Sequence, residues 1–212
     1  MDKSLPPRRP LVLASASPRR LALLQQIGIE PTALLPTDLD ETPRRNEAPR
    51  ALASRLALEK AFAARDVASK RDDLADSLIL AGDTVVCVGR RILPKCEIRE
   101  EAQDCLRLLS GRAHRVFTGI ALCTSNGKTR ERVVESRLRF KRLSGREVEM
   151  YLATDEWRGK AGGYAIQGQA AMFVARLIGS YSGVVGLPLY ETAALLVGEG
   201  YPVLGGRFGD SG

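Results

Sequence analysis

The chain has 212 residues, of which 44% are hydrophobic and 27% are charged, which is ordinary for a globular protein with one large domain or two lobes around a shared core. No apolar run approaches the roughly 18 residues that a membrane-spanning helix needs, and the N-terminus lacks the apolar core of a signal peptide, so we expect a cytoplasmic protein without a membrane partner. The net charge of +7 fits a generally basic surface or an anionic partner, and the aromatic content of 5% favours a phosphate-bearing small ligand over nucleic acid.

The composition also limits the chemistry. A single histidine, His114, argues against a multi-histidine metal site and against serine-histidine or cysteine-histidine catalysis. The four cysteines form no CxxC pair and lie beside apolar residues, so we expect reduced structural thiols rather than a zinc site; they are Cys87, Cys96, Cys105 and Cys123. Catalysis is then left to carboxylates, lysines, arginines and backbone groups.

The N-terminal part predicts a strand followed by a helix. Residues 11–15 form a short apolar run, and Ser17 can cap a helix that begins at Pro18 and stops at Gly28. A polar loop that contains prolines follows over residues 35–46.

The next part predicts a longer helix over residues 49–65 and a charged connection over 66–76. The expected apolar side of that helix consists of Leu52, Leu56, Phe62 and Ala63, with Lys60 beside it. Residues 77–89 are rich in β-formers, and Gly82 within them suggests a β-bulge. A third helix fits residues 97–109.

The second half combines a hairpin with shorter elements. Two β-rich runs flank the turn Asn126-Gly127 and predict a β-hairpin over 114–140. Ser144 and Glu147 form a capping-box pattern before a helix that ends at Leu152. A glycine-rich loop, two strands and a final helix are predicted over 157–168, 172–178, 183–187 and 189–197. This mixture of βα units and a hairpin predicts an α/β fold with a mixed sheet.

The junction between the first strand and the first helix carries Ser15, Ser17, Arg19 and Arg20. A helix N-terminus attracts anions through its N–H groups and dipole, hydroxyls add donors, and arginine matches the geometry of phosphate. A capped helix with surface arginines explains the same pattern equally well. The junction lacks GxxxxGK[ST], so a Walker-type NTPase is not supported.

Asp83 lies inside the apolar run LILAGDTVVCV, where an ionised carboxylate is costly unless it is paired or binds a cation. The β pattern continues through Val85 and Val86, so Asp83 cannot be a helix cap. We therefore favour a functional role. Thr84 is expected on the opposite face of the strand, unless a bulge redirects it.

Four further charged residues could act with Asp83: Asp40, Glu41, Lys60 and Lys95. Singly, each is typical of a solvated surface. As a set they resemble what phosphoanhydride cleavage needs, because carboxylates hold a divalent cation and orient water while lysines neutralise phosphate charge. Spacing alone does not show that they converge.

The stretch GKAGGYAIQG, residues 159–168, has four glycines in ten residues, which lets a backbone approach a ligand closely. A flexible loop explains the glycines too. Gln167 offers both a donor and an acceptor, as reading the edge of a nucleobase requires.

Taken in order, these motifs resemble the Maf family of nucleoside triphosphate pyrophosphatases. The similar segments span about residues 10–198 and are LASASPRRLALL, AGDTVV, LSGRAHRVFTG, KAGGYAIQG and GSYSGVVGLPLYET. The resemblance implies an elongated, two-lobed α/β fold akin to inosine triphosphate pyrophosphatases, with a mixed sheet flanked by helices and a central cleft. We expect one domain over 10–198, a flexible leader over 1–9 and a tail over 199–212.

The resemblance further implies hydrolysis of a nucleoside triphosphate to the monophosphate and pyrophosphate with Mg²⁺ or Mn²⁺, and the AIQG loop is similar to the branch that prefers dTTP and UTP. Asp83 matches the position of the catalytic base, and Lys60 and Lys95 match further catalytic residues. Glu41 and Asp83 are expected to bind the metal ion. Substrate binding is assigned to Ser15, Ser17, Arg19, Arg20, Thr84 and Gln167, of which Arg19, Thr84 and Gln167 are linked to substrate choice.

One segment departs from the family pattern, which usually has Gly-Lys-Pro where this chain has Pro94-Lys95-Cys96. Lys95 is kept, and His114 is expected to be structural. Two other functions stay open: a hydrolase of different or modified nucleotides, and a regulatory protein of septum formation. Dimers occur in the family, and the sequence leaves open whether this chain forms a homodimer.

Overall fold

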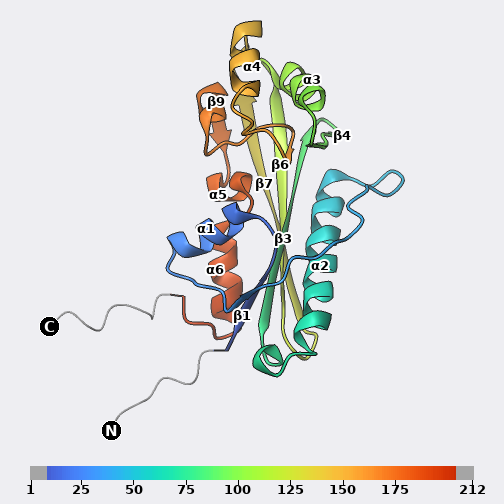
Figure 1. Cartoon of the computed structure of the whole chain (residues 1–212), viewed down its shortest axis with the longest axis vertical. Helices are drawn as coiled ribbons and strands as arrows, with labels where there is room; N and C mark the ends of the chain where they lie inside the picture. The colour runs from blue at the N-terminus through green and yellow to red at the C-terminus, as the bar shows by residue number, and fades with distance from the viewer. Residues whose placement is uncertain (1–8, 204–212) are drawn as a thin grey trace, which may run out of the picture.

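The structure, a computed structural model, describes residues 9–203 and shows a mixed α/β fold whose long strands run through the length of the molecule (Figure 1). Most of the expected leader and tail lie outside the described residues. Within residues 9–203, no helix is long and apolar enough to cross a membrane. The mixed sheet flanked by helices confirms the predicted fold class.

The elements alternate through most of the chain. The strands are β1 (Leu11–Ala14), β2 (Ala33–Leu34), β3 (Leu78–Val88), β4 (Arg91–Ile92), β5 (Lys95–Cys96), β6 (Ala113–Cys123), β7 (Thr129–Phe140), β8 (Lys160–Ala161) and β9 (Val174–Ile178). The α-helices are α1 (Pro18–Gln26), α2 (Pro49–Ala68), α3 (Arg99–Leu109), α4 (Gly145–Leu152), α5 (Tyr181–Val185) and α6 (Leu189–Gly198), and 3₁₀ helices lie at Asp72–Leu74 and Gln169–Phe173.

The main sheet has the order β2-β1-β3-β6-β7-β9, with β4 on β3, while β5 and β8 form a separate antiparallel pair. β1 pairs in parallel with β2 and β3, and the other pairs of the main sheet are antiparallel. One edge of β3 pairs with β1 only over residues 78–81 and with β4 only over 87–88. The stretch between them, residues 82–86, lies where β1 has ended, and this gap in the sheet is where the cleft opens.

Helix α2 covers one face of β3 and β6, whereas α1, α5 and α6 lie on the other side (Figure 1). The close approach of α2 depends on Gly119 of β6, because a Cβ at that position would lie 2.1 Å from the carbonyl oxygen of Ala53. Asp83 is the register partner of Gly119. The packing that Gly119 permits therefore brings the α2 side chains over Asp83.

The β-bulge predicted at Gly82 is wrong, because β3 and β6 keep a regular register through Gly82↔Ile120 and Asp83↔Gly119. The glycine supplies space instead. A Cβ there would lie 3.3 Å from the carbonyl oxygen of Gly119, tighter than most such contacts, and 3.4 Å from Nε of Arg20. With regular alternation, Thr84 and Asp83 lie on opposite faces of β3, which was the first of the two expectations.

The strand predicted over 183–187 is also wrong, since Tyr181–Val185 form helix α5. Val184 and Val185 favour strands by propensity, but the Ser180 hydroxyl accepts a hydrogen bond from the Gly183 N–H and starts a helix. The strand expected from residue 172 begins at Val174, after a 3₁₀ helix.

Helix α2 differs from its prediction in length and in its buried face. It extends to Ala68, its buried face is built mainly of alanines, and Phe62 and Ala63 are only partly buried. Lys60 does not flank that face but lies within it, 7% exposed. The hairpin, the capping box of Ser144 and the final helix are confirmed.

Candidate active site

All ten predicted site residues line one cleft of about 1030 Å³. They are Ser15, Ser17, Arg19, Arg20, Glu41, Lys60, Asp83, Thr84, Lys95 and Gln167. The cleft lies between the β1–α1 junction, the loop 37–43, α2, the middle of β3 and the loop 158–167. Asp40 is not among its lining residues; its carboxylate accepts the Thr42 N–H at 2.9 Å.

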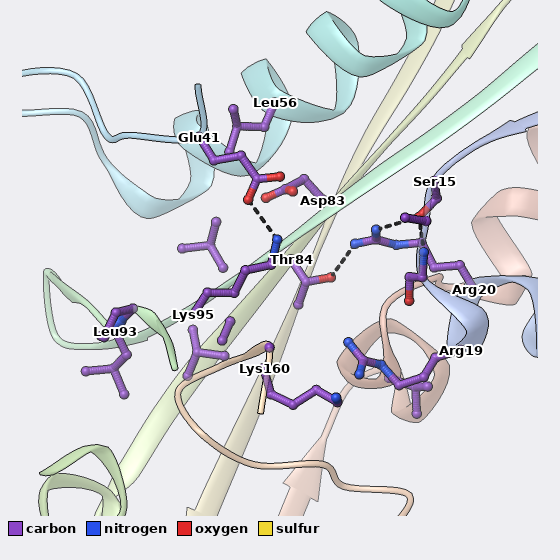
Figure 2. A pocket seen from close by; sticks show the side chains of 18 of the residues that line it. Ser15, Arg19, Arg20, Glu41, Leu56, Asp83, Thr84, Leu93, Lys95 and Lys160 are labelled. Carbon is purple, nitrogen blue, oxygen red and sulfur yellow. Dashed lines mark hydrogen bonds and ion pairs between the residues drawn. The ribbon is translucent and has the colours of Figure 1, made fainter. Parts of the chain in front are cut away.

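Four charges form a chain along one wall of the cleft. The Nζ of Lys60 lies 2.6 Å from Oδ1 of Asp83 and 2.6 Å from Oε1 of Glu41. The Nζ of Lys95 lies 3.0 Å from Oε2 of the same glutamate (Figure 2). Glu41 thus holds the exposed lysine of β5 against the buried lysine of α2.

The Asp83–Lys60 pair explains how a carboxylate can occupy an apolar strand. Asp83 is 6% exposed, and an ionised group with so little water is costly unless a partner compensates it. Lys60 engages Oδ1, whereas Oδ2 of Asp83 accepts no hydrogen bond from the described residues. One oxygen of the carboxylate is therefore fixed and the other is available at the cleft.

Glu41 stays ionised for a related reason. Burial raises the pKa of its carboxyl, but the hydrogen bonds and charges of Lys60 and Lys95 outweigh burial, so the net pKa lies below the usual range. The wall therefore presents two carboxylates and two lysines, which together are neutral before a ligand arrives.

The opposite wall fixes Arg20 in one position. Its Nε donates to the Gly186 carbonyl at 2.8 Å, and its Nη atoms lie 3.1 Å from the Ser15 hydroxyl and 3.4 Å from the Thr84 hydroxyl (Figure 2). Burial lowers the pKa of Arg20, while the charges of Asp83 and Glu41 oppose that effect. Arg20 therefore joins α1, β3 and the loop after α5.

Arg19, its neighbour in sequence, makes no hydrogen bond or ion pair to other residues within 9–203. Burial, followed by the charge of Arg20, lowers the pKa of Arg19 to about 10, which still leaves it protonated at neutral pH. Its donors are thus directed into the cleft without a protein acceptor, as expected for a group that binds an anion.

The sequence analysis missed Lys160, which also lines the cleft and points toward Arg19 (Figure 2). Burial and the charge of Arg19 lower the pKa of Lys160. Its position follows from the pairing of β8 with β5, in which Lys160 is opposite Cys96, next to Lys95. Its place at the start of the KAGG segment was the signal that could have identified it.

Ser17 occupies the predicted N-cap position, but its side chain makes no capping hydrogen bond. Its N–H instead donates to the Ser15 hydroxyl at 3.1 Å. Gln167 is exposed at the cleft, and no side-chain hydrogen bond to another described residue engages it. Both side chains are therefore free for a ligand.

His114 lies in the core rather than in the cleft lining, 2% exposed, with Nε2 2.9 Å from the Tyr164 hydroxyl. Burial lowers the pKa of His114 to about 4, so the ring is neutral at neutral pH. The four cysteines are buried and free.

The carboxylates that line the cleft suit a divalent cation only if substrate phosphates also hold it. Among residues 9–203, no group of three or more histidine, cysteine, aspartate or glutamate side chains could hold a metal ion. Glu41 and Asp83 are instead bridged by Lys60, and the other acids that line the cleft are Asp38 and Glu97. Mg²⁺ is commonly held by one or two carboxylates together with substrate phosphates and water. The donor set therefore suits an ion that arrives with phosphates.

A cleft with cations that have no carboxylate partner within residues 9–203 on one side, and a buried acid on the other, defines a site for a polyanionic ligand. Residues 10–199 match the family described as Maf-like protein, and the chain therefore belongs to the Maf family. The predicted resemblance is confirmed.

Individual relatives are similar over nearly their whole length. A protein of Rhodopseudomonas palustris named dTTP/UTP pyrophosphatase is 62% identical over 196 residues, covering 92% of this chain and 95% of that protein. A protein of the same name from Chelativorans sp. is 61% identical and covers 90% and 91%, respectively. Among solved structures, a HAM1 protein from Coxiella burnetii aligns with a TM-score of 0.48 and 17% identity over 90% of this chain and 99% of that chain.

Proposed function

We propose that this chain hydrolyses dTTP and UTP to the monophosphate and pyrophosphate. The observation that carries the proposal is the Asp83 carboxylate, which is buried in the sheet with one oxygen fixed by Lys60 and the other open to the cleft. Two cations that line this cleft, Arg19 and Lys160, have no carboxylate partner within residues 9–203. Relatives that are about 60% identical carry the name dTTP/UTP pyrophosphatase. The substrate pool lies in the cytoplasm, where this proposal places the enzyme.

The triphosphate binds along the β1–α1 junction. Arg19 and Lys160 have no carboxylate partner within residues 9–203 and supply positive charge to its oxygens, while the Ser17 hydroxyl is a further donor. Arg20 cannot turn toward the ligand as freely as Arg19, because its side chain donates to three protein acceptors. It orients Ser15 and Thr84 at the edge of the site and adds a fixed positive field.

Asp83 acts on the attacking water through Oδ2. A carboxylate held at one oxygen can accept a proton at the other without moving, so Oδ2 takes a proton from the water that attacks the α-phosphorus. The bond between the α-phosphorus and the oxygen bridging to the β-phosphate then breaks, and pyrophosphate leaves. Lys60 holds the Asp83 carboxylate in place through its ion pair with Oδ1. Lys95 balances Glu41 and stabilises the negative charge that develops on the phosphates.

Glu41 and Asp83 are the residues that would hold a Mg²⁺ or Mn²⁺ ion brought by the nucleotide. Such an ion supplies charge neutralisation of the phosphate oxygens. The exposed side chain of Gln167, on the loop over the cleft, presents an amide to the base. An amide donor and acceptor suit the carbonyl and N–H edge that thymine and uracil share.

The test is product analysis with a panel of nucleotides: dTTP, UTP, CTP, modified pyrimidine triphosphates and 7-methyl-GTP. We expect the highest rates with dTTP and UTP and equimolar release of monophosphate and pyrophosphate. Hydrolysis in ¹⁸O-labelled water should place the label in the monophosphate. Label in the pyrophosphate, or release of orthophosphate with a diphosphate, would contradict the proposed attack. A protein that releases nothing yet shifts nucleic acid in gels would be a binding protein instead.

A further inference from the structure

A second hollow, of about 690 Å³, lies where the loop after α3, the end of β7 and strand β9 meet. It shares no lining residue with the cleft. Five basic residues line it: Arg112, Arg139, Lys141, Arg142 and Arg176. This hollow is strongly cationic, and no part of the proposed reaction uses it.

The backbone forces these charges together. Arg139 of β7 and Arg176 of β9 are direct cross-strand partners, an arrangement in which like charges repel. The N–H of Phe140 donates to the carbonyl of Arg112 at 3.1 Å, which places Arg112 beside the same end of β7. Arg142 follows two residues after Phe140 on the loop that leaves the strand.

No acid compensates this repulsion. Among residues 9–203, no hydrogen bond or ion pair engages the side chains of the four arginines, and only Lys141 has a carboxylate partner, Glu147. Elsewhere on the surface, arginines such as Arg71 and Arg99 do pair with carboxylates. The hollow therefore holds four guanidinium groups, each with unused donors.

We propose that this hollow binds a compact anion with two or three linked phosphates. Arginine forks match phosphate oxygens in pairs, and four of them exceed what a single phosphate needs. Ser110 adds a donor, because its hydroxyl oxygen accepts the Leu143 N–H at 2.8 Å and leaves its own proton free. The ring of Phe140 is only 1% exposed, so the hollow offers no face on which a base could stack. That favours a phosphate chain over single-stranded nucleic acid.

The test is calorimetric titration with inorganic triphosphate, without divalent cations and at low salt. The double variant R139A/R176A removes the opposed pair of arginines. R90A/R132A is the matched control, because it also removes two exposed arginines but from outside both cavities. We expect two classes of triphosphate-binding site in the wild type and in the control. In R139A/R176A, one class should be lost, or its association constant should fall at least tenfold.

Melting temperature gives a second readout, which tests the repulsion between the arginines in the ligand-free protein. Removing the repulsion should make R139A/R176A melt at a higher temperature than the wild type at low salt, and high salt should abolish the difference. The wild type should itself melt at a higher temperature when triphosphate is present.

Equal triphosphate binding by the wild type and R139A/R176A would overturn the proposal, as would an equal loss in R90A/R132A. Loss of duplex or single-stranded oligonucleotide binding alone, with triphosphate unaffected, would assign the hollow to nucleic acid instead. Pyrophosphate release from dTTP should not change in R139A/R176A. A failed nucleotide panel would leave the titration result standing, so the two proposals are tested separately.

Discussion

Lys60 and Asp83 form a buried ion pair, with Nζ 2.6 Å from Oδ1, that joins helix α2 to strand β3. The same ammonium group also reaches Glu41 on the loop above the helix. The pair can form only because Gly119, opposite Asp83 in the sheet, lets α2 lie directly on the strands. The position of the proposed general base is thus tied to helix–sheet packing.

Replacing Gly119 by alanine should destabilise the protein and impair catalysis. The new Cβ would lie 2.1 Å from the Ala53 carbonyl oxygen, so α2 must shift, at a cost of about 1–3 kcal/mol as for other overpacked sites. Urea unfolding measures the loss. Gly145→Ala is the control, because a Cβ there meets nothing within 4 Å. Equal stability of the two variants would show that α2 does not depend on Gly119.

Arg19 and Arg20 should behave differently although they are adjacent. Arg19→Ala should raise KM for dTTP about 10- to 100-fold, as expected for loss of a charged hydrogen bond of about 1.5–3 kcal/mol, and leave the melting temperature unchanged. Arg20→Ala should lower both activity and melting temperature, because Arg20 has three protein partners. Steady-state kinetics and thermal melting separate these outcomes. A large drop in melting temperature for Arg19→Ala would contradict the assignment.

The loop that carries Glu41 should be held in a pH-dependent way by Glu47. Hydrogen bonds from Arg55, at 2.7 and 2.8 Å, outweigh burial and lower the pKa of Glu47 from 4.5 to about 2. Because the pKa of Glu47 is depressed in the folded state, the stabilisation of the fold by ionised Glu47 is complete above about pH 4.5. It is lost as the pH falls toward about 2.

The free energy of unfolding of Glu47→Gln should therefore lie below that of the wild type at pH 7, and the difference should shrink between pH 4.5 and pH 2. Denaturant titrations across that range measure it. Glu30→Gln serves as the control, because Glu30 has only a 3.3 Å contact with Gln25. A difference that grew on acidification would contradict the sign.

Chelation should abolish turnover without unfolding the protein. The carboxylates of Glu41 and Asp83 are already paired with lysines, so the proposed ion is held mainly through the nucleotide. EDTA should stop pyrophosphate release and leave the melting temperature of the ligand-free protein unchanged, and added Mg²⁺ or Mn²⁺ should restore activity. A fall in melting temperature with EDTA alone would indicate a resident metal instead.

Much of the fold could be predicted because its signals are local. The hairpin follows from an Asn-Gly turn between β-rich runs, and α4 follows from the Ser144–Glu147 capping box. Helix α5 could not be predicted from propensity, since its valines favour a strand and only the hydrogen bond from the Gly183 N–H to the Ser180 hydroxyl decides the outcome. Local chemistry overrode propensity there.

The candidate site could be predicted as a set of residues but not as a geometry. Asp83 stood out because it interrupts an apolar strand. The burial of Lys60 could not be predicted, because it results from α2 packing on Gly119, far away in sequence. Lys160 was missed for a similar reason, since only the pairing of β8 with β5 carries it beside Lys95.

The most direct test of the central claim is pyrophosphate release from dTTP by Asp83→Asn, measured beside Asp40→Asn, which makes the same change outside the cleft. We expect kcat to fall at least about 100-fold in Asp83→Asn, as for loss of a general base, with KM close to wild type. The variant should still fold but melt at a lower temperature, because Lys60 keeps only one of its two carboxylate partners. Asp40→Asn should stay fully active. An Asp83→Asn protein that hydrolyses dTTP at the wild-type rate would contradict the account.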